Sequence, residues 1–345
     1  MIEIDGSYGE GGGQILRTSL ALSILTKKPF IIRNIRANRP NPGLRPQHLA
    51  AIKVLQGLSN ANVEGASVGS SEISFYPGDI EAGKYKFDMG TAGSITLVLQ
   101  AILPTAFLTS SKISLSLRGG TDVKWSPSWD DFDKVFLHVL STLGIKVKTE
   151  LIKRGFYPAG GGEVTVEIFP SESLDSIRVD EPLRYENVEG NIVISKLPDD
   201  IPKRIKHSIV KQMVHYSING EINIEKCDTL SPGVIVTLWA DSNYSRIGCA
   251  ILGEKGLPSE ILGRKCALNI IDDIKSGVTL DMYATDQILP YIAYITSYRG
   301  EKSVLLSREL TRHAKTNAWL IEKFLPVKFL IERKEGLVRL EVRQA

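Results

Sequence analysis

Three stretches of the chain repeat one order of hydrophobic and polar positions: small or polar residues, an apolar helical run, a stop at proline, and an alternating strand. The first helix begins at residues 11–13, and the strand FIIRNI follows it. The second begins at residues 90–94 and is expected to stop at Pro104, before the strand KISLSLRG. The third begins at residues 311–317 and stops at Pro326, before VKFLIERK. The pattern predicts an α+β unit used at least three times.

A Ser-rich, acidic segment bracketed by prolines, residues 170–182, interrupts this pattern. Beyond it, strands and two helices, near residues 201–217 and 260–274, have a periodicity of their own. We therefore expect a large domain formed by residues 1–179 and 279–345, with a smaller α+β domain, residues 180–278, inserted into it.

Composition narrows the class of protein. The 345 residues are 43% hydrophobic and 23% charged, which excludes a collagen, a coiled coil or a disordered chain. A net charge of +3 means that any contact with nucleic acid must come from a local basic cluster. No apolar run is long enough for a membrane span, and residues 1–13 resemble neither a signal nor a transit peptide. Three widely spaced cysteines favour a reducing, cytoplasmic location over a disulfide framework or a zinc site.

The segment SYGEGGGQILR combines three consecutive glycines with Glu10 and Arg17. Glycines allow a backbone to approach phosphate oxygens, and the helix start behind them presents free N–H groups. A carboxylate at such a place would repel phosphate unless a divalent metal lay between them. The alternative is a tight turn between a strand and a helix. A Walker A loop is excluded because no GK[ST] follows.

Residues 30–49 carry four arginines and a histidine, without one acidic residue: Arg33, Arg36, Arg39, Arg45 and His48. Prolines make this stretch a rigid loop, and the planar guanidinium suits bidentate binding of phosphate. We favour a phosphate site here over the alternative, a solvated charged face.

His313 lies at the predicted start of the third helix, between Arg312 and Ala314 and close to Lys315. A helix N-terminus and nearby cations disfavour the imidazolium, so this ring is expected to be neutral and nucleophilic at pH 7. Taken alone, a histidine with a capping or core role is the more common case. The run RGFYPAGGGEV, residues 154–164, is expected to form a hairpin turn with a close approach of the backbone.

Together these segments resemble the RNA 3′-terminal phosphate cyclase family over essentially the whole chain. The run RGFYPAGGG resembles the signature of that family. Further motifs are similar too: EGGGQILR, RANRPNPGLRPQH, GSITLVLQ, YATDQILP and HAKTNAWLIEKFLP.

The resemblance implies an α+β fold: three repeated α/β sandwich units, as in enolpyruvyl transferases, with a smaller inserted α+β domain. It also implies a reaction in three steps. The histidine at position 313 attacks the α-phosphate of ATP, the AMP passes to an RNA 3′-phosphate, and the vicinal 2′-hydroxyl then closes a 2′,3′-cyclic phosphate.

The same resemblance assigns roles to residues of this chain. His313 is the catalytic nucleophile, and Glu10 is the ligand of Mg²⁺ or Mn²⁺. Four residues correspond to ligands of the triphosphate or the RNA 3′-phosphate: Arg17, Arg36, Arg39 and Gln47. Five correspond to the adenylate pocket: Gln100, Pro127, Tyr283, Asp286 and Gln287. The implied partner is RNA with a 3′-phosphate end. No membrane is implied, and homo-oligomer formation is left open.

Three other functions compete with this one. The cyclase-like branch works in ribosome biogenesis without cyclase activity and lacks the nucleophilic histidine, whereas this chain has His313. An enolpyruvyl transferase would have two similar halves and a longer chain. A plain RNA-binding module is disfavoured by the near-neutral charge and the lack of an aromatic RNA-binding motif.

Overall fold

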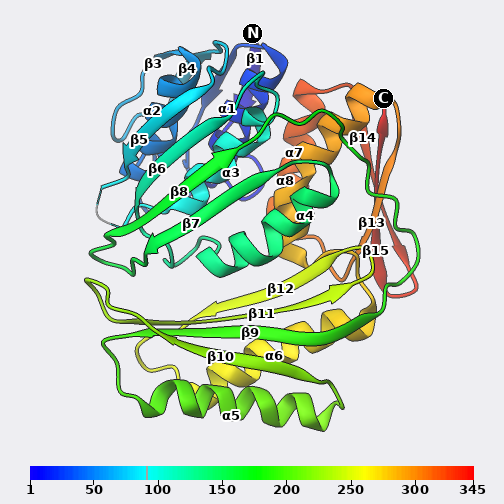
Figure 1. Cartoon of the computed structure of the whole chain (residues 1–345). Coiled ribbons are helices and arrows are strands. Elements are labelled where there is room, and N and C mark those ends of the chain that lie inside the picture. Colours follow the sequence, from blue (N-terminus) through cyan, green and yellow to red (C-terminus); the bar gives the residue numbers. More distant parts are fainter. Residues whose placement is uncertain (91) are drawn as a thin grey trace.

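The computed structural model describes residues 1–90 and 92–345. The first unit (Figure 1, blue) contains two helices, α1 (Gly13–Thr26) and α2 (Pro46–Ser59), and one sheet. Its strands are β1 (Ile2–Asp5), β2 (Phe30–Arg33), β3 (Asn62–Glu64) and β4 (Ile73–Tyr76). Their order in the sheet is β1-β2-β4-β3, with β1 parallel to β2 and the other pairs antiparallel.

The second unit repeats this topology. Its strands are β5 (Gly83–Asp88), β6 (Ile113–Gly119), β7 (Val147–Lys153) and β8 (Gly162–Ile168), in the order β5-β6-β8-β7. Helix α3 (Ile95–Ala106) takes the place of α1. A π-helical turn, η1 (Asp131–Phe136), continues into α4 (Leu137–Thr142) and takes the place of α2. The first pair of strands is again parallel and the others antiparallel.

The third unit has the same order with one difference. Strands β13 (Ser303–Ser307), β14 (Val327–Lys334) and β15 (Leu337–Gln344) form the sheet β13-β15-β14, and the helices are α7 (Met282–Arg299) and α8 (Arg312–Phe324). In place of a first strand, Arg178 forms a single parallel bridge with Val304 of β13. The chain leaves the unit after this bridge and returns at α7.

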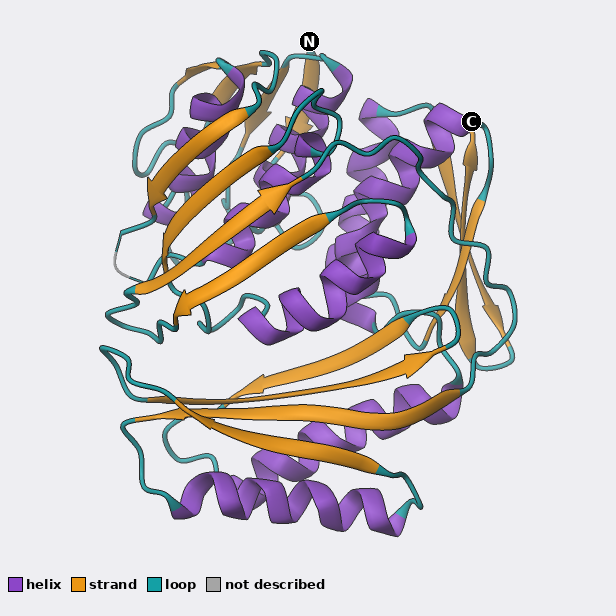
Figure 2. Cartoon of the chain, viewed as in Figure 1, coloured by secondary structure: helices purple, strands orange, loops and turns teal. Residues whose placement is uncertain are grey.

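Between these two points the chain builds a fourth sheet. Its strands are β9 (Tyr185–Ser195), β10 (Gly220–Lys226), β11 (Gly233–Ser242) and β12 (Arg246–Leu252), in the order β10-β9-β11-β12. Helices α5 (Asp200–His215) and α6 (Ser259–Ser276) cover one face of this sheet (Figure 2). Their apolar sides share a hydrophobic cluster with the strands, separate from the main core.

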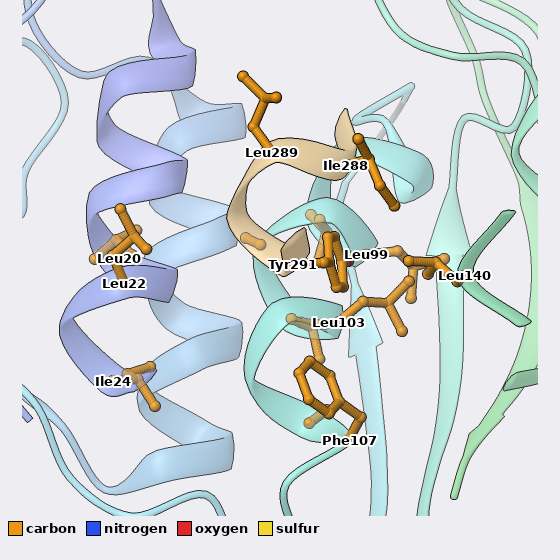
Figure 3. Close-up of a cluster of buried hydrophobic side chains, with 14 of the residues drawn as sticks. Leu20, Leu22, Ile24, Leu99, Leu103, Phe107, Leu140, Ile288, Leu289 and Tyr291 are labelled. Atoms are coloured by element: carbon orange, nitrogen blue, oxygen red, sulfur yellow. The ribbon is translucent and has the colours of Figure 1, made fainter. Parts of the chain in front are cut away.

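The main core joins the helices of the three units. Helix α1 contacts α2, α3 and α8, and α7 contacts α3 and α8. Buried side chains of α1, α3, α4 and α7, such as Leu20, Leu99, Leu140 and Ile288, belong to one hydrophobic cluster (Figure 3). The helices of the three units therefore pack on one another in a single core.

The predicted fold class, three α+β units with a smaller inserted α+β part, is confirmed. The domain boundaries at residues 179–180 and 278–279 stay a prediction. One element differs: α3 continues two residues past Pro104, the expected stop. Proline removes one helical hydrogen bond, but the residues around Pro104 are buried, and this packing holds the last turn. In the described part of the chain, every helix is too short or too polar to cross a membrane.

Candidate active site

The glycine loop between β1 and α1 is shaped for close approach. Gly11 has a φ of +57°, in the left-handed region that favours glycine. Gly12 is the N-cap of α1 and supplies no capping side chain, so the first N–H groups of the helix remain available. A Cβ on Gly13 would lie 2.2 Å from Nε2 of His48. Only glycine therefore lets this imidazole lie against the start of α1.

His48 is buried under that loop, with 1% of its surface exposed. Its Nδ1 accepts a hydrogen bond from the backbone N–H of Arg45, at 3.0 Å, at the N-terminus of α2. In the neutral ring the proton is consequently on Nε2, the atom that faces Gly13. Burial, helped by the nearby arginines, lowers the pKa of His48 to about 3, so the ring is neutral at any physiological pH.

His313 lies in the first turn of α8. Thr311 caps this helix, because its Oγ1 accepts from the backbone N–H of Ala314 at 3.0 Å. The ring of His313 is about half exposed, and its Nε2 contacts Oε2 of Glu10. Its Nδ1 faces Asp286, with 4.0 Å to the nearer carboxylate oxygen.

The pKa of His313 is lowered, mainly by burial. The glutamate at position 10 opposes this shift, while the positive charges of Arg17 and Arg39 add to it. The predicted direction is confirmed, but the cations that act on the ring belong to the first unit. Residues 312 and 315, the neighbours in sequence, are not among them.

Asp286 lies on α7, beneath His313. The hydroxyl of Thr311 donates to its carboxylate, whose two oxygens lie 2.5 and 2.6 Å away. Burial is the main cause that raises the pKa of Asp286 to about 7, and the charges of Asp281 and Glu10 act in the same direction. The sequence placed Asp286 in the adenylate pocket, and the structure adds contact with the cap of the histidine helix.

A second polar link locks the three helices at the site. The side chain of Asn317 on α8 donates to the backbone carbonyl of Asp286 on α7, at 3.2 Å. It accepts from Oγ1 of Thr18 on α1, at 3.0 Å. The side chain of Gln14 also donates to the carbonyl of His313, at 3.3 Å. The first and third units are thus held together at the point where the histidine lies.

The predicted phosphate ligands divide into two groups. Arg39 reaches the site: its Nη2 lies 3.6 Å from Oε1 of Glu10 and within 3.2 Å of a Cβ added at Gly12. Arg17 and Gln47 line one pocket, together with residues that surround the start of α3. Burial lowers the pKa of Arg17 to about 10, so it keeps its positive charge at pH 7.

Arg36 has a different environment from the other phosphate candidates. Its Nη1 donates to the carbonyls of Asn41 and Gly43, at 2.6 and 3.0 Å. The residue itself has a left-handed backbone, with φ of +55°. Its guanidinium therefore braces the arginine loop from inside.

Three of the predicted nucleoside residues are linked in a chain of hydrogen bonds. Gln100 on α3 donates to the side-chain carbonyl of Gln287 on α7, at 2.7 Å, and Gln287 donates to the carbonyl of Tyr283, at 3.2 Å. Tyr283 leaves 58% of its surface exposed at the start of α7, so a ring face is open to a ligand. The carbonyl of Pro127 accepts from Thr96 on α3, at 2.9 Å.

The signature run forms the predicted hairpin connection between β7 and β8. Its Arg154 is buried and pairs with three carboxylates: Asp122 at 3.4 Å, Asp130 at 2.7 Å and Glu225 at 2.8 Å. The last of these belongs to β10 of the fourth sheet. Arg154 therefore links the fourth sheet to the second unit, so the contribution of the signature run that the structure shows is to the joining of these two parts.

The sequence missed the placement of His48 and the double role of Thr311, which caps α8 and binds Asp286. The first had a signal: His48 lies three residues after Arg45 and two after Pro46, the spacing of an N-terminal helix cap. The second had none, because residues 286 and 311 meet only when α7 packs on α8.

The fold and the site define a class: an enzyme of three α+β units with a half-exposed imidazole, carboxylates and arginines around a glycine-lined helix start. Comparison with known proteins identifies the family within this class. The family model "RNA 3′-terminal phosphate cyclase" matches residues 8–331. The chain belongs to the RNA 3′-terminal phosphate cyclase family, as its motifs predicted.

Individual relatives agree over their full lengths. The chain is 44% identical to the RNA 3′-terminal phosphate cyclase of Korarchaeum cryptofilum, covering 97% of this chain and 95% of that protein. It is 45% identical to the protein of that name from Thermococcus kodakarensis, covering 97% and 96%. For Nitrosospira multiformis the identity is 41%, covering 99% and 97%. The enolpyruvyl transferase and the plain RNA-binding module are therefore wrong interpretations.

Proposed function

We propose that this protein converts an RNA 3′-terminal phosphate to a 2′,3′-cyclic phosphate, with ATP as co-substrate and through a covalent histidine–AMP. The observation that carries the proposal is the position of His313. Its ring is half exposed at a helix N-terminus, has a lowered pKa, and is surrounded by Glu10, Arg17 and Arg39. This is an arrangement for a neutral nitrogen nucleophile facing a phosphate.

In the first step Nε2 of His313 attacks the α-phosphorus of ATP. The new P–N bond forms as the bond to the β-phosphate oxygen breaks, and pyrophosphate leaves. The lone pair must be on Nε2, so the ring proton is on Nδ1, the atom that faces Asp286. The carboxylate of Asp286 is held by Thr311 and stabilises the positive charge that develops on the ring.

Glu10 would hold a divalent cation, Mg²⁺ or Mn²⁺. In the described part of the chain no group of three or more acidic, histidine or cysteine side chains forms a metal cage. A single carboxylate beside a phosphate site fits a Mg²⁺ ion that keeps its other ligands from phosphates and water. Such an ion would neutralise charge on the triphosphate. Glu10 would then leave its contact with Nε2, which frees the nucleophile.

In the second step a 3′-phosphate oxygen of the RNA attacks the same phosphorus. The P–N bond breaks, the histidine is released, and the RNA carries a phosphoanhydride to AMP. In the third step the 2′-oxygen attacks the terminal RNA phosphorus, AMP leaves, and the 2′-hydroxyl proton is lost. The histidine that leaves in the second step and the AMP that leaves in the third are far better leaving groups than the oxide that direct ring closure would expel. This is the reason for activation by ATP.

The phosphate and nucleoside ligands follow from where the side chains lie. Arg39 faces the start of α1 and Glu10, and Arg17 and Gln47 lie together in a narrow pocket near it, which supports the assignment of these three to phosphate. Arg36 supports the loop that presents them.

At the other end, Tyr283 offers its exposed ring to adenine, with Pro127 as the second wall. Gln100 and Gln287 fix the helices below it. The three cysteines are free thiols, which accords with a reducing, cytoplasmic location.

The non-catalytic, cyclase-like branch is the second candidate, and it lacks a nucleophilic histidine. The test is incubation with [α-³²P]ATP and Mg²⁺ or Mn²⁺ without RNA, followed by a denaturing gel. An acid-labile, alkali-stable label that is lost on addition of RNA with a 3′-phosphate is the expected result. His313→Ala should take up no label, and His215→Ala, a change at an exposed histidine on α5, should label normally. An unlabelled wild type under both metals would leave the non-catalytic branch as the function.

A further inference from the structure

Two tryptophans in the segment WSPSW, residues 125–129, lie in opposite environments. Trp129 is buried, with 2% of its surface exposed, and packs against Phe132 of η1. Trp125 exposes 87% of its surface, and its backbone has a φ of +63°. A bulky residue in the left-handed region is a costly conformation that persists only where the surroundings impose it. The fold thus holds a large apolar ring out in solvent.

The contacts of this loop keep it rigid. Oγ of Ser126 donates to the carbonyl of Val123, at 2.8 Å, and the backbone N–H of Trp129 donates to buried Asp122, at 3.1 Å. Nζ of Lys124 lies 5.1 Å from the centre of the Trp125 ring and 3.0 Å from a carboxylate oxygen of Glu254. The indole is therefore preorganised, with an ammonium group over one of its faces.

The loop is attached to the active site. Two residues beyond Trp125, the carbonyl of Pro127 accepts from Thr96 in the first turn of α3. The N-cap of that helix, Ser94, lines the same pocket as Arg17 and Gln47. The loop of Trp125 is thus tied to the start of α3 and, through Lys124 and Glu254, to the loop that follows β12.

We propose that Trp125 is a stacking platform for a nucleobase of unpaired RNA near its 3′ end. The proposal rests on the proposed function, since it takes RNA as the substrate. An exposed indole is a sequence-tolerant surface for a base, and Lys124 beside it suits the adjoining phosphodiester. ATP is the less suitable occupant, because its adenine is already assigned to the exposed ring of Tyr283, which leaves Trp125 for a base of the RNA.

The test compares Trp125→Ala, Trp125→Phe and wild type. Binding of a short single-stranded RNA with a 3′-phosphate is titrated without ATP, so no reaction occurs. Loss of one stacked base weakens binding by roughly tenfold or more, which we expect for the alanine variant, while phenylalanine restores most of the affinity. Tyr298→Ala is the matched control: this tyrosine is 75% exposed at the far end of α7 from Tyr283. It should bind RNA as wild type does.

Two further measurements distinguish RNA from ATP as the source of the stacked base. A third distinguishes a failure of this proposal from a failure of the proposed function. In a set of RNA oligonucleotides, each with a single abasic site near the 3′ end, one abasic position should weaken binding to wild type. The same position should not weaken binding to the alanine variant relative to intact RNA. The KM for ATP in self-adenylylation should stay unchanged in Trp125→Ala. Unchanged RNA affinity, or a raised KM for ATP alone, would overturn the inference. A wild type that binds RNA but never becomes adenylylated would refute the proposed function while leaving the RNA-binding comparison valid.

Discussion

The close approach of Gly13 to His48 gives a sharp test of how the phosphate loop is built. In Gly13→Ala the new Cβ would lie 2.2 Å from Nε2 and 2.7 Å from Cδ2 of the imidazole, where about 3.4 Å is the ordinary lower limit. The ring has no free space to yield, because it is buried and its Nδ1 is bonded to the N–H of Arg45. Either α1 or α2 must shift.

The expected change in the unfolding free energy is the difference between two opposing contributions. Overpacking a closed site costs about 1–3 kcal/mol, while replacing glycine by alanine in a helix gains at most about 1 kcal/mol. The expected net loss in unfolding free energy is therefore about 1–2 kcal/mol. Gly12→Ala is the control, because its Cβ would meet the terminal nitrogen of Arg39, at 3.2 Å, and that long side chain can move.

The assay is urea unfolding of a double-mutant cycle: wild type, Gly13→Ala, His48→Ala and the double variant. If the ring causes the cost, Gly13→Ala should be nearly neutral once His48 is alanine, and the coupling should equal most of the single-variant loss. An equal cost of Gly13→Ala in both backgrounds would refute the close-approach argument.

Three other expectations follow from the site and its supports. Glu10→Ala should raise the Mg²⁺ or Mn²⁺ concentration needed for half-maximal self-adenylylation by tenfold or more, and an unchanged metal titration would exclude Glu10 as a ligand. Because the pKa of His313 lies below its usual 6.5, the neutral ring persists as pH falls. In Asp286→Asn, which removes the carboxyl whose pKa is raised to about 7, the single-turnover adenylylation rate should therefore stay flat from pH 8 to 7 and drop only below about 6.5; a decline in this variant that begins above pH 7 would contradict the lowered pKa of His313. Arg154→Met leaves the carboxylates of Asp122 and Asp130 buried without their cation. The free energy of unfolding in urea should therefore fall by about 3–5 kcal/mol at pH 7 and by less at pH 5, where the carboxylates can take up protons. Equal losses at the two pH values would indicate that packing, and not charge, is the cause.

Much of the architecture was accessible from local pattern. Apolar runs of helical period followed by alternating strands gave α1, α3 and α8 with their following strands, because amphipathic periodicity is a property of neighbouring residues. The break at residues 170–182 indicated an insertion for the same reason. Topology was less accessible: the single bridge of Arg178 with Val304, which stands in for a first strand, joins residues 126 positions apart, and no local pattern predicts it.

The candidate residues of the site could be named from the sequence, but most of the groups that set their chemical state could not. His313 could be recognised as a histidine at a helix start, and helix N-termini disfavour imidazolium wherever they occur. The charges that act on it, Arg17, Arg39 and Glu10, come from another unit almost 300 residues away. Burial of Asp286 and of His48 likewise depends on which helices pack together.

The amino-acid sequence by itself determined the elements, the repeated unit and the family, because these depend on local periodicity and on contiguous motifs. Only the tertiary structure decided which groups face one another. Pairing, burial and pKa are properties of distances between side chains, and folding sets those distances when the helices of the three units close on one core. His313, the carboxylates of Glu10 and Asp286, and the arginines of the first unit were brought together at that stage.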